Sequence, residues 1–316
     1  MKPLKTVIAA LALAAAGSAL AQPGEAIKII VPFAAGGPTD QIARVIATPL
    51  GAILGKPVVV DNRGGAGGVV GVGVVAKSPP DGSTLLLTTS SLVITAGTVP
   101  TLPYNAHKDV EPVYLLGEVQ TLLVVRPSLG VNTLQELVAK AKGPGKLNYG
   151  STGVGGTMHI GAELFARAAG VSMVHVPYRG AAPALVDLMA GTIDLVNADV
   201  PVLRPYVKDG RLKALAIYDT KRSPQLPDVP TAAEAGLPAL QMNNWYGVLV
   251  PAGMAPELKK KFENALDQVV HQPEIAAKLA EAGFIGPQGT QAFKAKLDAD
   301  FKHWIPWLKE AGIQTK

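Results

Sequence analysis

The chain has 316 residues, of which 48% are hydrophobic and 17% charged, with a formal net charge of +5 and no cysteine. The absence of cysteine excludes disulfides, thiolate catalysis and cysteine-ligated metals, so the core alone must hold the fold together. The basic excess is small and evenly spread, which argues against a nucleic-acid partner.

The N-terminus has the pattern of a secretory signal peptide. Residues 1–21, MKPLKTVIAALALAAAGSALA, combine a basic start, an apolar stretch and an A-x-A cleavage motif ending at Ala21. The apolar stretch is shorter than the roughly 20 residues that a membrane-spanning helix needs. We therefore predict cleavage after Ala21 and export from the cytoplasm. The mature chain would have 295 residues (316 minus 21) and a charge of +3 (+5 minus two lysines), a length typical of two domains.

After this leader, short β-branched runs alternate with amphipathic stretches. The pattern predicts strands over 26–33, 56–62 and 82–91, and helices over 38–54 and 68–78. This β-α-β-α-β order indicates a parallel sheet with helices on both faces.

The same alternation begins again after residue 120. Strands are predicted over 121–127, 146–151, 172–178, 192–199 and 211–219, with helices over 133–142, 157–170 and 181–191. From Ala255 to Gly312 the pattern is helical. The chain therefore contains two α/β units and a helical tail.

Two glycine loops occupy matching places, one in each unit. PFAAGGPTD (32–40) and GSTGVGGTMH (150–159) each lie between the end of a strand and the start of a helix. Unpaired N–H groups and the helix dipole favour anions at such a position. A single loop of this kind indicates a tight turn, but two in matching places favour an anion site.

Other known motifs do not fit. The Gly-Lys pairs at 55–56 and 145–146 lack the Ser or Thr of a Walker loop, and there is no H-E-x-x-H or G-x-S-x-G. Gly71-x-Gly73-x-x-Ala76 has the letters of a dinucleotide fingerprint, but it lies inside a helical run, so we interpret these glycines as close packing. We predict neither cofactor nor metal. An exported hydrolase or transferase remains an alternative, with Ser151 and His159 as its nucleophile and base.

Further polar side chains lie at predicted strand ends. Ser90 and Ser91 end the third strand, Asn197 and Asp199 end a strand of the second unit, and Tyr178 follows another. Trp245 and Tyr246 belong to NNWYG near the return to the first unit, where core packing and a cleft wall are equally open interpretations.

An ordered set of motifs resembles the Bug-type solute-binding receptors of tripartite tricarboxylate transporters. It comprises IKIIVPFAAGGPTDQIARVIA, VVVDNRGGAGGVVGV, SPPDGSTLL, KLNYGSTGVGGTMHIGAELF, VHVPYRGAAPALVDLMAGTIDL and RSPQLPDVPTAAEAGLP. The resemblance runs from about residue 26 to the C-terminus. It implies a periplasmic α/β protein of the two-lobed type II Venus flytrap fold, each lobe a mainly parallel sheet flanked by helices. Such a receptor binds a small carboxylate and delivers it to a membrane permease.

The resemblance also implies boundaries and site residues. Lobe one would comprise 22–122 plus 243–316, and lobe two 123–242. Main-chain N–H groups of the two glycine loops would bind the carboxylate. With the strand-end candidates, the predicted ligand-binding set is Phe33, Ala34, Ala35, Gly36, Gly37, Thr39, Asp40, Ser90, Ser91, Ser151, Thr152, Gly155, Gly156, Thr157, His159, Tyr178, Asn197, Asp199 and Trp245.

The chain departs from the family pattern at the far end of the expected ligand. It has SSLVITAG after the third strand, and Asn197-Ala198-Asp199 where many members have a Phe-Asp-Asn type of strand end. A carboxylate at Asp199 would repel a second anionic group unless water or a cation lay between them, so a neutral or amine-bearing far end is compatible with the sequence. We expect a monomeric, non-enzymatic receptor that delivers its solute to integral membrane subunits. A ligand-sensing subunit that docks on a membrane sensor kinase is a further alternative.

Overall fold

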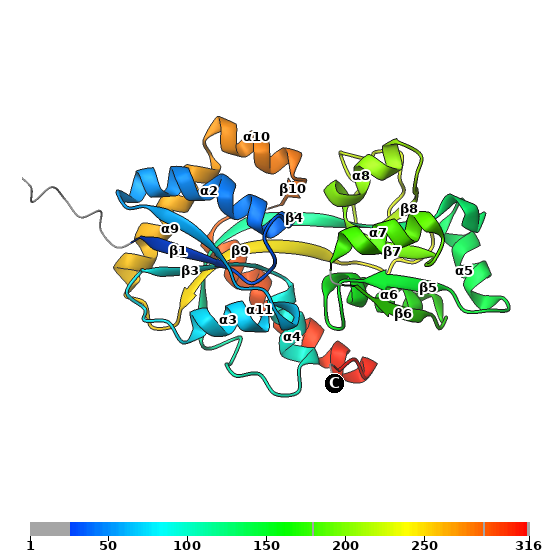
Figure 1. Cartoon of the computed structure of the whole chain (residues 1–316), viewed down its shortest axis with the longest axis horizontal. Coiled ribbons are helices and arrows are strands. Elements are labelled where there is room, and N and C mark those ends of the chain that lie inside the picture. Colours follow the sequence, from blue (N-terminus) through cyan, green and yellow to red (C-terminus); the bar gives the residue numbers. More distant parts are fainter. Residues whose placement is uncertain (1–25, 179, 287, 315–316) are drawn as a thin grey trace, which may run out of the picture.

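The computed structural model describes residues 26–178, 180–286 and 288–314, so the predicted signal peptide lies outside the described residues (Figure 1). The strands are β1 (Ile27–Val31), β2 (Val58–Asn62), β3 (Thr84–Thr89), β4 (Val110–Val125), β5 (Asn148–Ser151), β6 (Val174–Pro177), β7 (Leu195–Asp199), β8 (Lys213–Ile217), β9 (Asn243–Pro251) and β10 (Phe284–Ile285). The α-helices are α2 (Pro38–Leu54), α3 (Val69–Ala76), α4 (Ser91–Thr98), α5 (Leu134–Lys142), α6 (Thr157–Ala169), α7 (Ala181–Ala190), α8 (Val200–Lys208), α9 (Pro256–Val270), α10 (Pro273–Glu281) and α11 (Thr290–Ala311). Within these ranges no helix combines the length and the apolar character that a bilayer crossing requires.

One long strand joins two groups of strands. The order is β2-β1-β3-β9-β4-β7-β5-β6, and β8 and β10 also pair with β4. Residues 110–120 of β4 pair with β9, whereas residues 121–125 pair with β7 and β8. Figure 1 shows β4 and β9 running between the two halves of the molecule. The half that contains β1, β2 and β3 is called the first half. Helices α2, α9 and α10 lie on one side of its sheet, and α3, α4 and α11 lie on the other.

The sheets are parallel at their outer strands and antiparallel where they meet. β1 pairs in parallel with β2 and β3, and β5 pairs in parallel with β6 and β7. β9 is antiparallel to β3 and β4, and β4 is antiparallel to β7 and β8. The α/β architecture predicted from the sequence is confirmed, and the parallel character is confined to the outer strands.

Several predicted elements match the structure closely, and others were missed. Helix α2 has the bounds predicted from its periodicity, because Pro38 starts it and Gly55 ends it with a left-handed backbone (φ +67°). The tail is helical in α9, α10 and α11, as expected. No sequence pattern predicted α4, α8, β9 or the first part of β4. The two strand segments are buried on both faces and therefore lack a clear period.

Of the two glycines of α3, Gly71 is confirmed as a close-packing residue, whereas Gly73 has room for a methyl group, with the nearest atom in the Tyr104 ring at 3.4 Å. A Cβ atom at Gly71 would lie 2.7 Å from Pro32 and 2.8 Å from the carbonyl oxygen of Arg63, so only glycine lets the helix approach this loop. The prediction that this segment is not a dinucleotide turn agrees with its place inside the helix.

Helix α11 covers the side of the sheet that carries Trp245. The indole is fully buried, its ring lies edge-on to Phe293 with centroids 5.0 Å apart, and its Nε1–H donates to Asp300 Oδ2 at 2.8 Å. Gly247, two residues along β9, lies directly under Phe293: a Cβ there would be 2.1 Å from the ring. The helical tail is therefore an integral part of the first half of the molecule.

We expect Gly247→Ala to lower the free energy of unfolding by about 1–3 kcal/mol, because the added methyl group overpacks the contact with Phe293. Gly73→Ala is the matched control: it adds the same methyl group at another buried glycine, where the nearest atom, in the Tyr104 ring, is 3.4 Å away. Thermal melting should show a loss for the first variant and none for the second, since alanine favours the helix. Equal losses in both would contradict this packing.

Candidate functional site

Four strands end at the place where the two sheets meet. β1, β3, β5 and β7 lead directly or through a short loop into α2, α4, α6 and α8. The last residues of β3 and β7, Thr89 and Asp199, pair with Tyr246 and Thr121, so both ends lie against the β4–β9 pair. Figure 1 shows the loops after β1 and β5 on the inner sides of the two halves. Ligands bind at such carboxyl ends in open α/β sheets.

The first glycine loop is shaped by Asp40. The Gly36 N–H donates to Asp40 Oδ2 at 2.9 Å, and the Arg44 Nε–H donates to the same oxygen at 3.0 Å. Burial raises the pKa of Asp40, but the hydrogen bonds from Arg44 and Gly36 outweigh it and hold that pKa below its usual value. Asn62 Nδ2 donates to the carbonyl oxygen of Phe33 at 3.2 Å. The exposed tip of the loop is thus tied down at both ends.

The second glycine loop uses a histidine in the same way. The Gly155 N–H donates to His159 Nδ1 at 3.2 Å, and His159 is almost completely buried. Burial lowers the pKa of His159 to about 4, with His175 adding to the effect. The imidazole is therefore neutral at neutral pH, with its proton on Nε2.

Asp40 and His159 occupy equivalent positions, since each is the third residue of its helix and accepts from a glycine N–H four residues earlier. The N–H groups of Thr39 and Asp40 in α2, and of Thr157 and Met158 in α6, have no acceptor among the residues that the structure describes. Unpaired N–H groups at a helix start are donors for an anion. Each loop is held in shape by its own side chain and keeps main-chain donors free.

Ser151 is buried beneath the second loop, and its partner is not the one expected. Its Oγ lies 2.5 Å from His175 Nε2 and accepts from the Gly153 N–H at 3.0 Å. The ring of His175 stacks on that of His159, with centroids 4.3 Å apart. The hydrolase alternative paired Ser151 with His159, and this pairing is wrong because Nδ1 of His159 is taken by Gly155. Ser151 itself is fully buried and out of reach of a substrate.

Asp199 lies at the centre of a hydrogen-bond chain between the two halves. Tyr246 Oη–H donates to Asp199 Oδ2 at 2.8 Å, and Asn244 Nδ2–H donates to the same oxygen at 3.1 Å. Ser90 Oγ–H in turn donates to Asn244 Oδ1 at 2.7 Å. Burial raises the pKa of Asp199 to about 6, although the bonds from Tyr246 and Asn244 act in the opposite direction.

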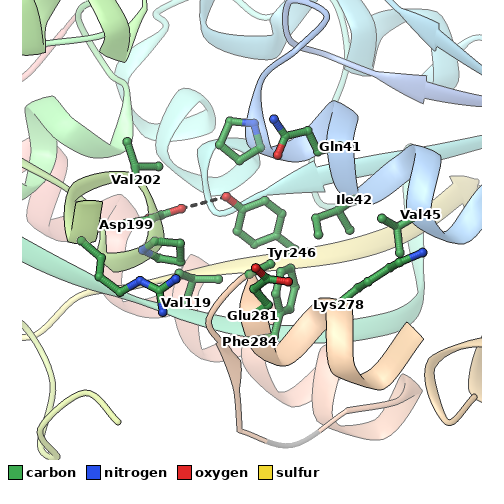
Figure 2. A pocket seen from close by; sticks show the side chains of 14 residues that line it. Gln41, Ile42, Val45, Val119, Asp199, Val202, Tyr246, Lys278, Glu281 and Phe284 are labelled. Carbon is green, nitrogen blue, oxygen red and sulfur yellow. Dashed lines mark hydrogen bonds between the residues drawn. The ribbon is translucent and has the colours of Figure 1, made fainter. Parts of the chain in front are cut away.

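A pocket of about 480 Å³ opens beside this chain. Figure 2 shows Asp199 and Tyr246 facing each other there, with Ile42, Val45, Val119, Val202 and Phe284 around them. The pocket also has Pro38 and Gln41 of α2 in its wall, and Gln41 Nε2–H donates to the Gly36 carbonyl oxygen at 3.2 Å. The pocket therefore borders the first glycine loop. Its remaining walls are formed by Pro201, Arg204, Lys278, Glu281 and Ala282.

Three of the residues predicted to bind the ligand do not line this pocket. Trp245 is a core residue under α11, so its alternative interpretation as packing is the correct one. Tyr178 Oη–H donates to Asp187 Oδ2 of α7 at 2.8 Å, which turns its ring toward that helix. Asn197 is buried against α6, where a Cβ at Gly161 would lie 2.1 Å from its Nδ2.

The other predicted residues lie on the two glycine loops or at the start of α4. Thr152 is exposed, Gly156 precedes α6 and Thr157 begins it. Ser91 is buried and bonded to Thr89, so its hydroxyl group supports the turn after β3.

His175 and Asn244 were not predicted, and Tyr246 was named only as an aromatic side chain of NNWYG, with core packing and a cleft wall equally open. Strand alternation could have assigned both Asn244 and Tyr246 to the site: with Trp245 facing the core under α11, its neighbours on β9 must face the opposite side of the sheet. That signal required residues 243–251 to be recognised as a strand. No local pattern pointed to the contact between Ser151 and His175, which lie on neighbouring strands.

Comparison with known proteins identifies relatives along almost the whole chain. The model of the tripartite tricarboxylate transporter family receptor matches residues 42–312. Protein BugT of Bordetella pertussis is 37% identical, over 98% of this chain and 96% of that protein. The solved structure of the periplasmic binding protein BugD is similar with a TM-score of 0.83 and 29% identity, over 93% of this chain and 100% of that one. R. palustris Rpa4515, solved with adipate, gives a TM-score of 0.84 and 33% identity, over 93% and 99%.

We expect Asp199→Asn to stabilise the ligand-free protein at pH 8. Because folding raises the pKa of Asp199 to about 6 from an ordinary 3.8, its charge weakens folding above pH 6. Below about pH 4 the group is protonated in both states, and the penalty disappears. The shift corresponds to about 1–3 kcal/mol in the free energy of unfolding. Unfolding of both proteins between pH 4 and pH 8 measures it.

Asp187→Asn is the matched control, since Asp187 also accepts a tyrosine hydroxyl bond at 2.8 Å but lies outside the pocket lining. It reports the cost of weakening such a bond. A wild-type protein more stable than Asp199→Asn at pH 8 would contradict the account. So would a difference that stays constant as the pH falls to 4.

Proposed function

The chain belongs to the tripartite tricarboxylate transporter receptor family, and on that premise we propose that its two glycine loops hold the carboxylate of a small solute between two lobes. Receptors of this family bind a solute without converting it, so the protein is a solute-binding receptor and not an enzyme. The observation that carries the proposal is the pair of equivalent loops. Each is held in shape by a side chain of the helix that follows it, Asp40 or His159, and each has free main-chain N–H groups.

The proposed lobes are 22–122 with 243–316, and 123–242. Support comes from β4, because its first part belongs to one group of strands and residues 121–125 to the other. The chain would return through the segment before β9. Bending at these two crossings would let the lobes approach each other as hinged domains do.

Binding would depend on donors from both lobes at once. In an open state, the unpaired N–H groups at the starts of α2 and α6 would be hydrated. A carboxylate that reaches both would replace water at each, and the excluded water would strengthen the new bonds. A solute that contacts both lobes favours the closed state by its difference in affinity for the two states.

The relatives bear on where the protein acts and on its partners. BugD is a periplasmic binding protein, and Rpa4515 was solved with adipate. We accordingly propose that this chain is exported, cleaved after Ala21 and active in the periplasm as a monomer. It would deliver its carboxylate to the integral membrane subunits of a tripartite permease.

Gly36→Ala should strongly weaken carboxylate binding while leaving the protein folded. Gly36 has φ +83°, and a Cβ there meets no atom within 4 Å, so the methyl group would occupy the open space in front of the loop. We expect a loss of at least about 1.4 kcal/mol, or tenfold, in affinity. A thermal-shift screen of mono-, di- and tricarboxylates identifies the solute, and calorimetry measures the affinity.

Gly210→Ala is the control for backbone strain. Gly210 also has a positive φ (+71°) and open space around its Cβ, but it lies in the turn after α8. Both variants should lose roughly 1–2 kcal/mol of stability. Binding by Gly36→Ala with wild-type affinity, or a screen in which no carboxylate raises the melting temperature, would refute the proposal.

A further inference from the structure

Asp199 stands at the start of a helix but does not cap it. It is the residue before α8, a position where an aspartate side chain commonly accepts the helix's own N–H groups. Here the side chain makes no such bond. It turns instead toward β9, where both of its hydrogen-bond donors, Asn244 and Tyr246, are located. The carboxylate therefore faces the pocket rather than its own helix.

One oxygen of this carboxylate is nearly free. Oδ2 accepts the bonds of 2.8 and 3.1 Å, whereas the single contact of Oδ1 is with Asn244 Nδ2 at 3.4 Å. An ionised carboxylate can accept about four hydrogen bonds. No Lys, Arg or His forms an ion pair with Asp199 within the described residues. The group thus retains acceptor capacity and an unpaired charge.

The surroundings of Oδ1 suit the far end of a solute. Asp199 is half-buried in the wall of the 480 Å³ pocket, beside the side chains of Val119, Val202 and Phe284 (Figure 2). Pro38, next to the first glycine loop, lines the same space. A second carboxylate placed at Asp199 would be repelled, while a donor would be attracted. A half-buried charge that weakens folding and has no ion-pair partner is typical of functional positions.

We propose that the solute is a carboxylate with a short apolar body and an N–H or O–H donor at its far end, which donates to Oδ1 of Asp199. This inference rests on the proposed function, because the glycine loops supply the site for the solute's own carboxylate. Asp199 is then the specificity-determining residue. It selects amino- or hydroxy-carboxylates against dicarboxylates of the same length.

Two matched series test the proposal by calorimetry at pH 8. One consists of butanoate, 4-hydroxybutanoate, 4-aminobutanoate and succinate, and the other of hexanoate, 6-hydroxyhexanoate, 6-aminohexanoate and adipate. In wild-type protein the best donor-bearing member should bind about tenfold or more tightly than the plain acid and the diacid. Comparing the amino and hydroxy members shows whether the donor is charged.

Variants separate recognition from folding. Asp199→Asn should reduce the advantage of the donor-bearing member to about threefold or less, and it should strengthen binding of the diacid. Tyr246→Phe removes a bond to Oδ2 but keeps the charge of Asp199, so the donor preference should persist. Asp187→Asn changes an equivalent tyrosine-bonded carboxylate outside the pocket lining and should leave the preference unchanged.

The possible outcomes are distinct. Carboxylates that bind with no donor preference, or a preference that survives in Asp199→Asn, would overturn this inference and leave the proposed function standing. Tighter binding of succinate or adipate in wild-type protein would do the same, and would assign the far end to Arg204 in the same pocket. Failure of every carboxylate to bind would refute the proposed function and the inference together.

Discussion

The shared strand β4 is the constraint on which the rest of the molecule depends. Because residues 110–120 pair in one group of strands and residues 121–125 in the other, the two α/β units cannot be placed independently. The carboxyl ends of β1, β3, β5 and β7 must then meet beside the β4–β9 pair. Four helix starts, and the two glycine loops, are brought together as a consequence of this register.

Loop shape and solute recognition are carried by different atoms. Asp40 and His159 each use a side chain to hold the N–H of a glycine, and this leaves later N–H groups of α2 and α6 free. A site built from main-chain donors recognises the carboxylate common to many solutes. The differences between solutes must then be read elsewhere, and the polar chain Ser90–Asn244–Asp199–Tyr246 offers side chains for that purpose.

The sequence predicted elements with clear boundaries and the loops between them, including α2 and both glycine loops. It did not predict β9 or the first part of β4, because strands buried on both faces show no alternation of polar and apolar residues. The errors at the site have the same origin. Trp245 could be placed only once β9 was known, and the contact between Ser151 and His175 depends on the pairing of β5 with β6. Local patterns identify a strand end, but the sheet register decides which side chains meet there.

The central claim is that a carboxylate draws the two lobes together, and spin-label distances test it most directly. The sequence has no cysteine, so cysteines introduced by Val59→Cys on β2 and Val186→Cys on α7 would be the only attachment sites for spin labels. Both positions are exposed, and they lie on different proposed lobes. Distances measured with and without the carboxylate found by screening should shorten on binding. Saturation of the site with no change in the distance distribution would contradict the account.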